Sequence, residues 1–205
     1  MGRKMAGALA AAGLLLILGA VLLLGVLAVR RGLRSPAVER RAAPAPSLSG
    51  VVEYVYDGDT IEVSVPVTRT VYSPGVGKVR VLGIDTPDGH NEEKTAAQAS
   101  RYGLTPPQVR RWAEEATGQA IARLKGRRVV LEIGGDRRDD YGRTLAYVHV
   151  GEGERAEDFG LFMLEHGFAA AYRSGMHRRR AAYLAAEETA RAAGAGMWRD
   201  ARPGS

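Results

Sequence analysis

Alternating hydrophobic and polar positions between residues 51 and 150 predict β-strands, and hydrophobic positions three and four residues apart predict helices. The predicted strands are 51–55, 60–65, 78–84, 127–133 and 144–150, and the predicted helices are 106–124, 156–166 and 178–193. Thr105 is placed to cap the first helix, and Gly167 and Gly194 to end the other two. Strands that come first and helices that gather at one side predict an α+β fold, a small closed five-stranded β-barrel with about three packed helices.

A second hydrophobic pattern is the unbroken apolar run over residues 6–29, which contains no charged or hydrogen-bonding side chain. At ~1.5 Å per helical residue it can cross a hydrocarbon layer of ~30 Å. It predicts an N-terminal transmembrane anchor over residues 1–30. A cleaved signal peptide is the alternative, because Arg3 and Lys4 form a basic start and small residues follow at Ala43. The run exceeds the usual apolar length of about 7 to 15 residues, and Ala43 lies too far beyond it.

The organisation after the apolar run follows from composition. Residues 31–49 are rich in proline, alanine and arginine without apolar periodicity, which predicts a linker. The folded domain is expected over residues 50–200, and no internal repeat is visible in it.

Charge and cysteine content narrow the chemistry. The net charge of +6 arises near the N-terminus: residues 1–47 hold seven basic and one acidic side chain, so the remaining residues hold 22 of each sign. The basic block is therefore interpreted as contacting lipid head groups of a bilayer or fixing topology, and a nucleic-acid partner must be argued from a local site. The chain has no cysteine, which excludes disulfides, thiolate metal sites and cysteine nucleophiles.

The segment VYDGDTIEV joins the first two predicted strands across Asp57 and Gly58. An Asp-Gly pair between alternating apolar residues predicts a hairpin, with glycine in the positive φ of a type I′ turn. That turn does not explain Asp59, an aspartate at the first position of a strand, where it is disfavoured. Asp59 is therefore a candidate functional residue.

Two further charged groups end or begin predicted strands. In RVLGIDTPD, strand alternation places Arg80 on the side of Leu82 and Ile84, so the arginine requires an anionic partner. Carboxylates at Asp85 and Asp88 close this strand and could converge on a hard cation. In DRRDDYGR, most members are interpreted as a solvated loop, with Arg143 the exception.

The motifs DGDT, R-x-L-x-I-D-T-P and D-D-Y-G-R-x-L-A-Y-V, in this order, resemble the staphylococcal nuclease (thermonuclease) family. The similarity runs from about Val51 to Trp198. The resemblance implies an OB-fold barrel with packed helices. It also implies a calcium-dependent phosphodiesterase that acts on DNA and RNA with water as the attacking group and leaves 3′-phosphate ends.

Carried over to this chain, the resemblance implies that Asp59 and Asp85 are carboxylate ligands of Ca²⁺ and that Thr86 supplies a backbone carbonyl. It implies that Arg80 and Arg143 bind the phosphate. Two guanidinium forks suit a pentacovalent phosphate because they can hold its equatorial oxygens as negative charge accumulates.

Other positions follow less directly from the resemblance. Tyr172 falls near an aromatic residue that the family places at the nucleotide pocket, where a base could stack, and a half-buried core tyrosine is the equal alternative. The family's glutamate base after Thr-Pro is Asp88 here, one methylene shorter, and an offset of about 1 Å can cost on the order of 10²-fold. Glu92 or Glu93 in the following loop, residues 89–103, could supply the missing reach, with Asp88 preferred.

The sequence therefore predicts a membrane-anchored, calcium-dependent nuclease. The alternative is an OB-fold nucleic-acid-binding module that kept the fold and lost the activity, as the Asp88 replacement would permit. Arginines after the apolar run favour a cytoplasmic domain. Calcium availability, and the location usual in the resembled family, favour an extracytoplasmic domain, and we expect that location.

Overall fold

The computed structural model describes residues 47–65, 77–151, 153, 156–174 and 177–202. The predicted anchor and most of the predicted linker lie outside this range. Within it, no helix combines the length and the apolar character that a membrane crossing requires.

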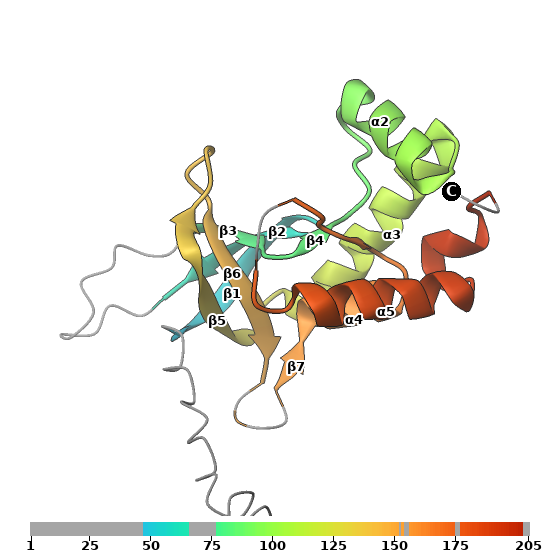
Figure 1. Ribbon diagram of the computed structural model, residues 1–205. Coiled ribbons are helices and arrows are strands. Elements are labelled where there is room, and N and C mark those ends of the chain that lie inside the picture. Colours follow the sequence, from blue (N-terminus) through green and yellow to red (C-terminus); the bar gives the residue numbers. More distant parts are fainter. Residues whose placement is uncertain (1–46, 66–76, 152, 154–155, 175–176, 203–205) are drawn as a thin grey trace, which may run out of the picture. The chain divides into compact units, whose positions relative to one another are not determined.

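Five strands close into the predicted barrel (Figure 1). They are β1 (Ser47–Asp57), β2 (Thr60–Ser64), β3 (Gly77–Val81), β5 (Arg128–Arg138) and β6 (Thr144–Val150). Neighbours pair antiparallel in the order β3-β2-β1-β5-β6, and a parallel pairing of β3 with β6 completes the ring. The five-stranded barrel is thus confirmed, and its strand order is that of an OB-fold. The short strand β7 (Glu157–Asp158) adds to the outer edge of β6.

Four α-helices lie to one side of the barrel in the part of the chain that the structure describes (Figure 1). They are α2 (Glu92–Tyr102), α3 (Pro106–Leu124), α4 (Phe159–Glu165) and α5 (Arg180–Ala192), followed by the 3₁₀ turn η2 (Gly196–Arg199). The predicted bounds of α3 are confirmed, including a capping box formed by Thr105 and Gln108. Helix α2 was not predicted and replaces the expected loop 89–103.

The predicted third strand is broken into two, and the break places Asp85. Strand β3 ends at Val81, and Gly83 turns the chain with a φ of +86°. Strand β4 (Ile84–Asp85) then leaves the barrel and pairs with β8 (Ala170–Ala171). A side chain at Gly83 would be strained at this φ, and its Cβ would lie 2.9 Å from Cδ2 of Tyr183.

Two hydrophobic clusters hold the fold together. The first fills the barrel and is closed at one end by Ala116, Ala120 and Leu124 of α3. The second lies among α2, α3, α5 and η2 and contains Trp198, whose ring packs edge-on against Tyr102 at 5.8 Å between centroids. The predicted packing of the C-terminal tail through Trp198 is confirmed. Strands β4 and β8 contribute Ile84 to the first cluster and Ala170 to the second, so they join the two.

Two partly buried histidines give the fold an expected pH dependence. Burial lowers the pKa of His149 and of His177, and the charges of Arg179 and Arg180, respectively, act in the same direction. The unfolded chain therefore takes up protons at a higher pH than the folded one. The contribution of these two histidines to the free energy of unfolding should be complete above about pH 6.5. It should be lost as the pH drops towards the folded pKa values.

Urea unfolding across this pH range checks the expectation. A His149→Gln/His177→Gln variant should show a flatter profile than the parent, whereas replacement of the exposed His90 by glutamine should leave the slope unchanged. Equal slopes in the double variant and the parent would show that these two histidines are not responsible.

Candidate active site

The turn between β1 and β2 brings Asp59 within hydrogen-bond distance of Thr86. The predicted type I′ turn is wrong, because Gly58 is not among the described glycines with positive φ. Glycine is needed there for a different reason: an added Cβ would lie 2.8 Å from Cγ2 of Thr86 and 3.0 Å from Cβ of Ala116. Asp57 accepts a hydrogen bond from the Asp59 amide at 3.0 Å and so shapes the turn.

Asp59 is a fully buried carboxylate whose two oxygens have different partners. Oδ2 accepts hydrogen bonds from both the amide and the hydroxyl of Thr86, each at 2.8 Å. Oδ1 forms an ion pair with Arg80 and accepts a bond from the Thr60 hydroxyl at 3.2 Å. A buried carboxylate persists only when it is paired and hydrogen-bonded, and these contacts satisfy Asp59.

Arg80 links the two predicted metal carboxylates. Its Nη1 pairs with Asp59, and its Nη2 lies 3.4 Å from Oδ1 of Asp85 and donates to the Ile84 carbonyl at 3.1 Å. The anionic partner expected for Arg80 is therefore confirmed. Burial lowers the pKa of Arg80 and the charge of Arg143 acts in the same direction, while Asp85 opposes both.

Asp85 is surrounded by side chains of α2, the unpredicted helix. Oδ2 accepts hydrogen bonds from the Tyr102 hydroxyl at 2.8 Å and from Gln98 Nε2 at 3.1 Å. Arg101 lies 3.6 Å from the same oxygen, and Lys94 lies 3.8 Å from Oδ1. Burial, followed by the charge of Asp85, raises the pKa of Tyr102, so its hydroxyl remains a donor across the ordinary pH range.

Asp88 organises the loop before α2. Its Oδ1 accepts from the His90 and Asn91 amides at 2.9 and 3.1 Å, and its Oδ2 lies 3.3 Å from Lys94. Partial burial raises the pKa of Asp88, but the two amides and the Lys94 charge outweigh it, and the pKa lies below its ordinary value. Glu92, an alternative candidate for the base, instead pairs with Arg110 at 2.6 Å.

Arg143 stands at the start of β6, which pairs with the strand that carries Arg80. Its guanidinium is held by Asp139, with Nε and Nη2 each 2.7 Å from Oδ2. Beside it, Tyr141 is 85% exposed, and the Arg143 guanidinium carbon lies 5.2 Å from the centre of its ring. Tyr141 belongs to the charged segment that the sequence predicts to be a solvated loop. Its position next to Arg143 in the D-D-Y-G-R motif is the signal that could have marked it as a candidate base contact.

Tyr172 follows β8 directly. Its amide donates to the Gly83 carbonyl at 2.9 Å, and its side chain is 44% exposed at the rim of a cavity beside Asp85. The exposure fits a stacking surface better than a core position.

The donor chemistry at Asp59 and Asp85 fits a hard divalent cation such as Ca²⁺, which binds carboxylate and carbonyl oxygens. The Thr86 carbonyl, the third predicted ligand, accepts a hydrogen bond from Gln98 at 2.9 Å. In the described ranges, no group of three or more His, Cys, Asp or Glu side chains is positioned to hold a metal ion. The chain thus offers two carboxylates, and any cation there would take most of its remaining ligands from water.

The structure therefore brings Asp59, Arg80, Asp85 and Thr86 into direct contact. Asp88 joins this group through Lys94, and Arg143 directly precedes the neighbouring strand β6. The α2 residues that contact Asp85 were missed. Their signal was a helix start at Asn91 with two acidic residues after it and a glycine stop at Gly103.

Comparison with known proteins agrees with this geometry. Residues 78–200 match the family model described as staphylococcal nuclease homologue. An uncharacterized protein of Methanocaldococcus jannaschii is 28% identical over 155 residues, which cover 73% of this chain and 70% of that protein. Endonuclease YhcR of Bacillus subtilis is 27% identical over 124 residues, and a probable endonuclease LCL3 of Colletotrichum graminicola is 31% identical over 171 residues.

The endonuclease relatives are longer than the matched region. The match covers 60% of this chain but only 9% of the Bacillus protein, and it covers 74% of this chain and 57% of the Colletotrichum protein. The family-model match, residues 78–200, includes Arg80, Asp85 and Arg143.

Proposed function

Because the chain belongs to the staphylococcal nuclease family, we propose that it hydrolyses phosphodiester bonds in DNA or RNA, depends on Ca²⁺ and leaves 3′-phosphate ends. The observation that carries the proposal is the contact of Arg80 with both Asp59 and Asp85. This contact supports the proposal because the guanidinium that would bind the phosphate lies beside two oxygen-donor carboxylates.

In the proposed mechanism, Arg80 and Arg143 bind the non-bridging oxygens of the scissile phosphate. A guanidinium has five N–H donors, so each arginine can keep its carboxylate and still donate to phosphate. Their bonds strengthen as charge builds up on the phosphate during attack by water. Asp59 and Asp85 would hold the cation, which when bound supplies charge stabilisation and a more acidic water. Tyr172 would stack on a base.

Asp88 is the proposed base that receives or orients the proton of water. Its low pKa keeps it ionised at neutral pH, although a weaker base accepts a proton less readily. The amides that hold its Oδ1 also favour the alternative function, a nucleic-acid-binding module without activity, because they give Asp88 a structural role.

The cellular location belongs to the proposal as well. We propose that residues 6–29 anchor the protein in the membrane and that the domain is extracytoplasmic. A site with two carboxylates binds Ca²⁺ weakly, and extracellular Ca²⁺ in the millimolar range would fill it.

Hydrolysis of heat-denatured DNA by the full chain, with Ca²⁺ or with a chelator, tests the function. We expect cleavage only with Ca²⁺, and a fall of about 10²-fold in Arg143→Ala. Arg128→Ala is the matched control, because Arg128 is exposed at the start of β5, roughly 20 Å along β1 from Asp57. A folded chain that binds DNA without cutting it would favour the binding module.

The base assignment has its own test. Asp88→Asn keeps an oxygen that can accept from the His90 and Asn91 amides but cannot take a proton from water. We expect kcat to fall by about 10²-fold while the domain stays folded, with a small loss of stability from the missing Lys94 ion pair, and Asp88→Glu to retain cleavage. If Asp88→Asn cleaves like the parent, Asp88 is a loop residue only.

A further inference from the structure

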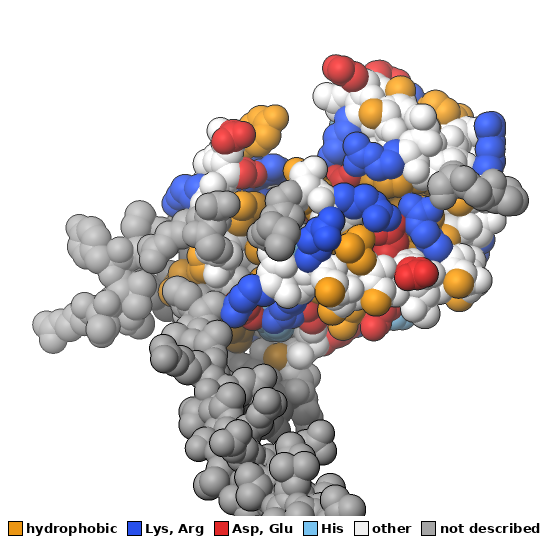
Figure 2. All heavy atoms as spheres, in the orientation of Figure 1, with side chains coloured by type: hydrophobic (Ala, Val, Ile, Leu, Met, Phe, Trp, Pro, Cys, Tyr) orange, Lys and Arg blue, Asp and Glu red, His pale blue; other side chains and the backbone are white. Residues whose placement is uncertain are grey.

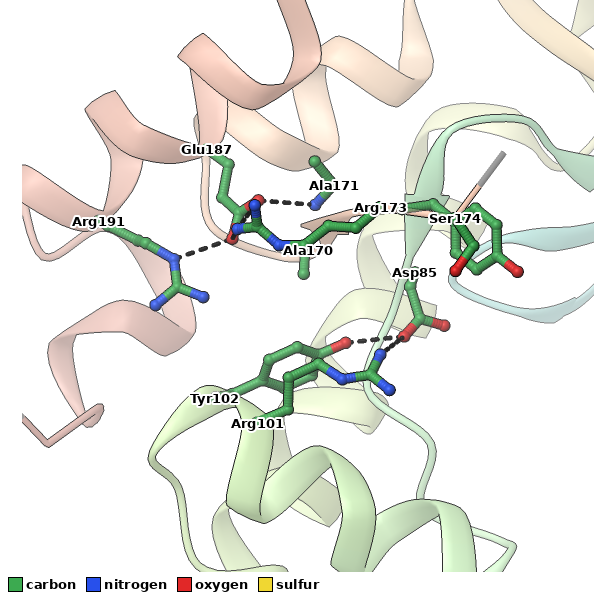
Figure 3. A pocket seen from close by; sticks show the side chains of 10 residues that line it. Asp85, Arg101, Tyr102, Ala170, Ala171, Arg173, Ser174, Glu187 and Arg191 are labelled. Carbon is green, nitrogen blue, oxygen red and sulfur yellow. Dashed lines mark hydrogen bonds and ion pairs between the residues drawn. The ribbon is translucent and has the colours of Figure 1, made fainter. Parts of the chain in front are cut away.

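A cavity of about 520 Å³ opens beside Asp85, between α2 and α5. Its floor is the short sheet of Asp85, Ala170 and Ala171. Its walls come from the end of α2, the segment after β8 and the second half of α5 (Figure 3). We call this cavity the α2–α5 cleft.

Three arginines from three separate elements line the α2–α5 cleft. Arg101 ends α2, Arg173 follows β8 and Arg191 lies on α5, and their guanidinium groups are placed around the same space (Figure 3). The side chains of Arg101 and Arg173 are 60% and 62% exposed. Only two carboxylates line the cleft, Asp85 and Glu187, so positive charge is in excess. Lys and Arg side chains gather on the same face over the hollow between α2 and α5 (Figure 2).

Glu187 fixes two of these arginines in place. Its side chain is only 2% exposed, and it accepts from the Ala171 amide at 3.1 Å, from Arg173 at 3.2 Å and from Arg191 at 2.9 Å. A buried carboxylate is costly unless fully paired, so this arrangement is a built site rather than a chance meeting of surface charges. Arg173 contacts Glu187 through Nη2, and a guanidinium with five N–H donors can bind a phosphate at the same time.

The α2–α5 cleft is also continuous with the proposed catalytic group. Arg80 contacts one oxygen of Asp85 and Arg101 lies 3.6 Å from the other. A strand whose scissile phosphate lies on Arg80 would therefore present a nearby phosphate to Arg101 and the cleft behind it. Grooves that follow a single-stranded backbone combine such positive charge with exposed aromatic rings, and Tyr172 lines the same cleft.

We propose that the α2–α5 cleft is a second phosphate site, in which Arg101 and Arg173 bind the phosphate next to the scissile one on the same single strand. This inference rests on the proposed nuclease function and adds a binding site beside the catalytic group.

The test compares two substrates in the full chain with Ca²⁺: a single-stranded oligonucleotide, and a dinucleoside monophosphate that has no neighbouring phosphate. Arg101→Gln/Arg173→Gln should raise KM for the oligonucleotide by about tenfold or more, the loss expected for one or two charge-assisted hydrogen bonds. Arg173→Gln alone, at a residue that pairs with Glu187, should leave kcat/KM for the dinucleoside substrate within roughly twofold. Arg128→Gln, with its equally exposed arginine on the barrel, should change neither.

Binding gives a second readout that does not need catalysis. Fluorescence anisotropy of a labelled oligonucleotide in chelator should show weaker binding in the double variant and a salt dependence shallower by ~0.7 per lost phosphate contact. Equal losses on both substrates, or no loss of oligonucleotide binding, would overturn the proposal. If the parent binds but never cuts, the nuclease function fails, while weaker binding in the variant still supports the α2–α5 cleft.

Discussion

Replacing Arg80 with lysine should lower kcat for single-stranded DNA by about 10²- to 10³-fold while the domain stays folded. Lysine keeps the positive charge beside Asp59 and so limits the loss of stability. It lacks the planar fork that lets Arg80 contact Asp59, Asp85 and the Ile84 carbonyl together. Lysine lacks the N–H groups whose hydrogen bonds to the phosphate we expect to strengthen as negative charge develops there.

Steady-state kinetics with Ca²⁺ check this expectation, and thermal unfolding followed by circular dichroism checks the fold. Arg128→Lys is the control, because it makes the same chemical change at an exposed position on the barrel. A variant that keeps the parental kcat would show that Arg80 acts only as a counterion for the two carboxylates.

Replacing Asp59 with asparagine should abolish calcium-dependent hydrolysis and also destabilise the domain. The amide preserves the shape of the side chain but removes the charge that pairs with Arg80 inside the protein. Breaking a buried ion pair costs about 3–5 kcal/mol, and we expect the lower end because Asp85 remains beside Arg80. Urea unfolding measures this loss.

Asp57→Asn is the matched control for this variant. It makes the same change in the same turn, and an asparagine oxygen can still accept from the Asp59 amide. It should lose little stability and little activity. If Asp59→Asn is as stable as the parent yet inactive, its role is confined to the cation and substrate; if it is fully active, Asp59 is not a cation ligand.

The barrel and α3 could be predicted from the sequence because local patterns determine them. Alternation marks the barrel strands, and α3 has an apolar face with a cap at Thr105 and prolines at its start. For such elements, burial and hydrogen bonding agree with the sequence pattern. The sequence also predicted an anionic partner for Arg80, which is confirmed. The structure differs in the face: Val79 and Val81 fill the barrel core, so Arg80 lies on the opposite face of β3.

Helix α2 and the place of Asp85 could not be predicted in the same way. The inward face of α2 is largely polar, with Thr95 and Gln98 buried against the site, so the helix has a weak apolar pattern. Asp85 lies in β4, which pairs with a partner 85 residues further along the chain rather than continuing β3. Neither contact leaves a periodic signal, because each depends on tertiary packing.

The pairing of β4 with β8 has a consequence for how the protein is made. Synthesis proceeds from the N-terminus, so Asp59, Arg80 and Asp85 leave the ribosome before Ala170 and α5 exist. Until β8 is available, β4 lacks its strand partner, and the cleft lined by Glu187 has no second wall. The contacts among Asp59, Arg80 and Asp85 involve only residues that precede β8. The α2–α5 cleft is therefore the last part of the candidate site that synthesis completes.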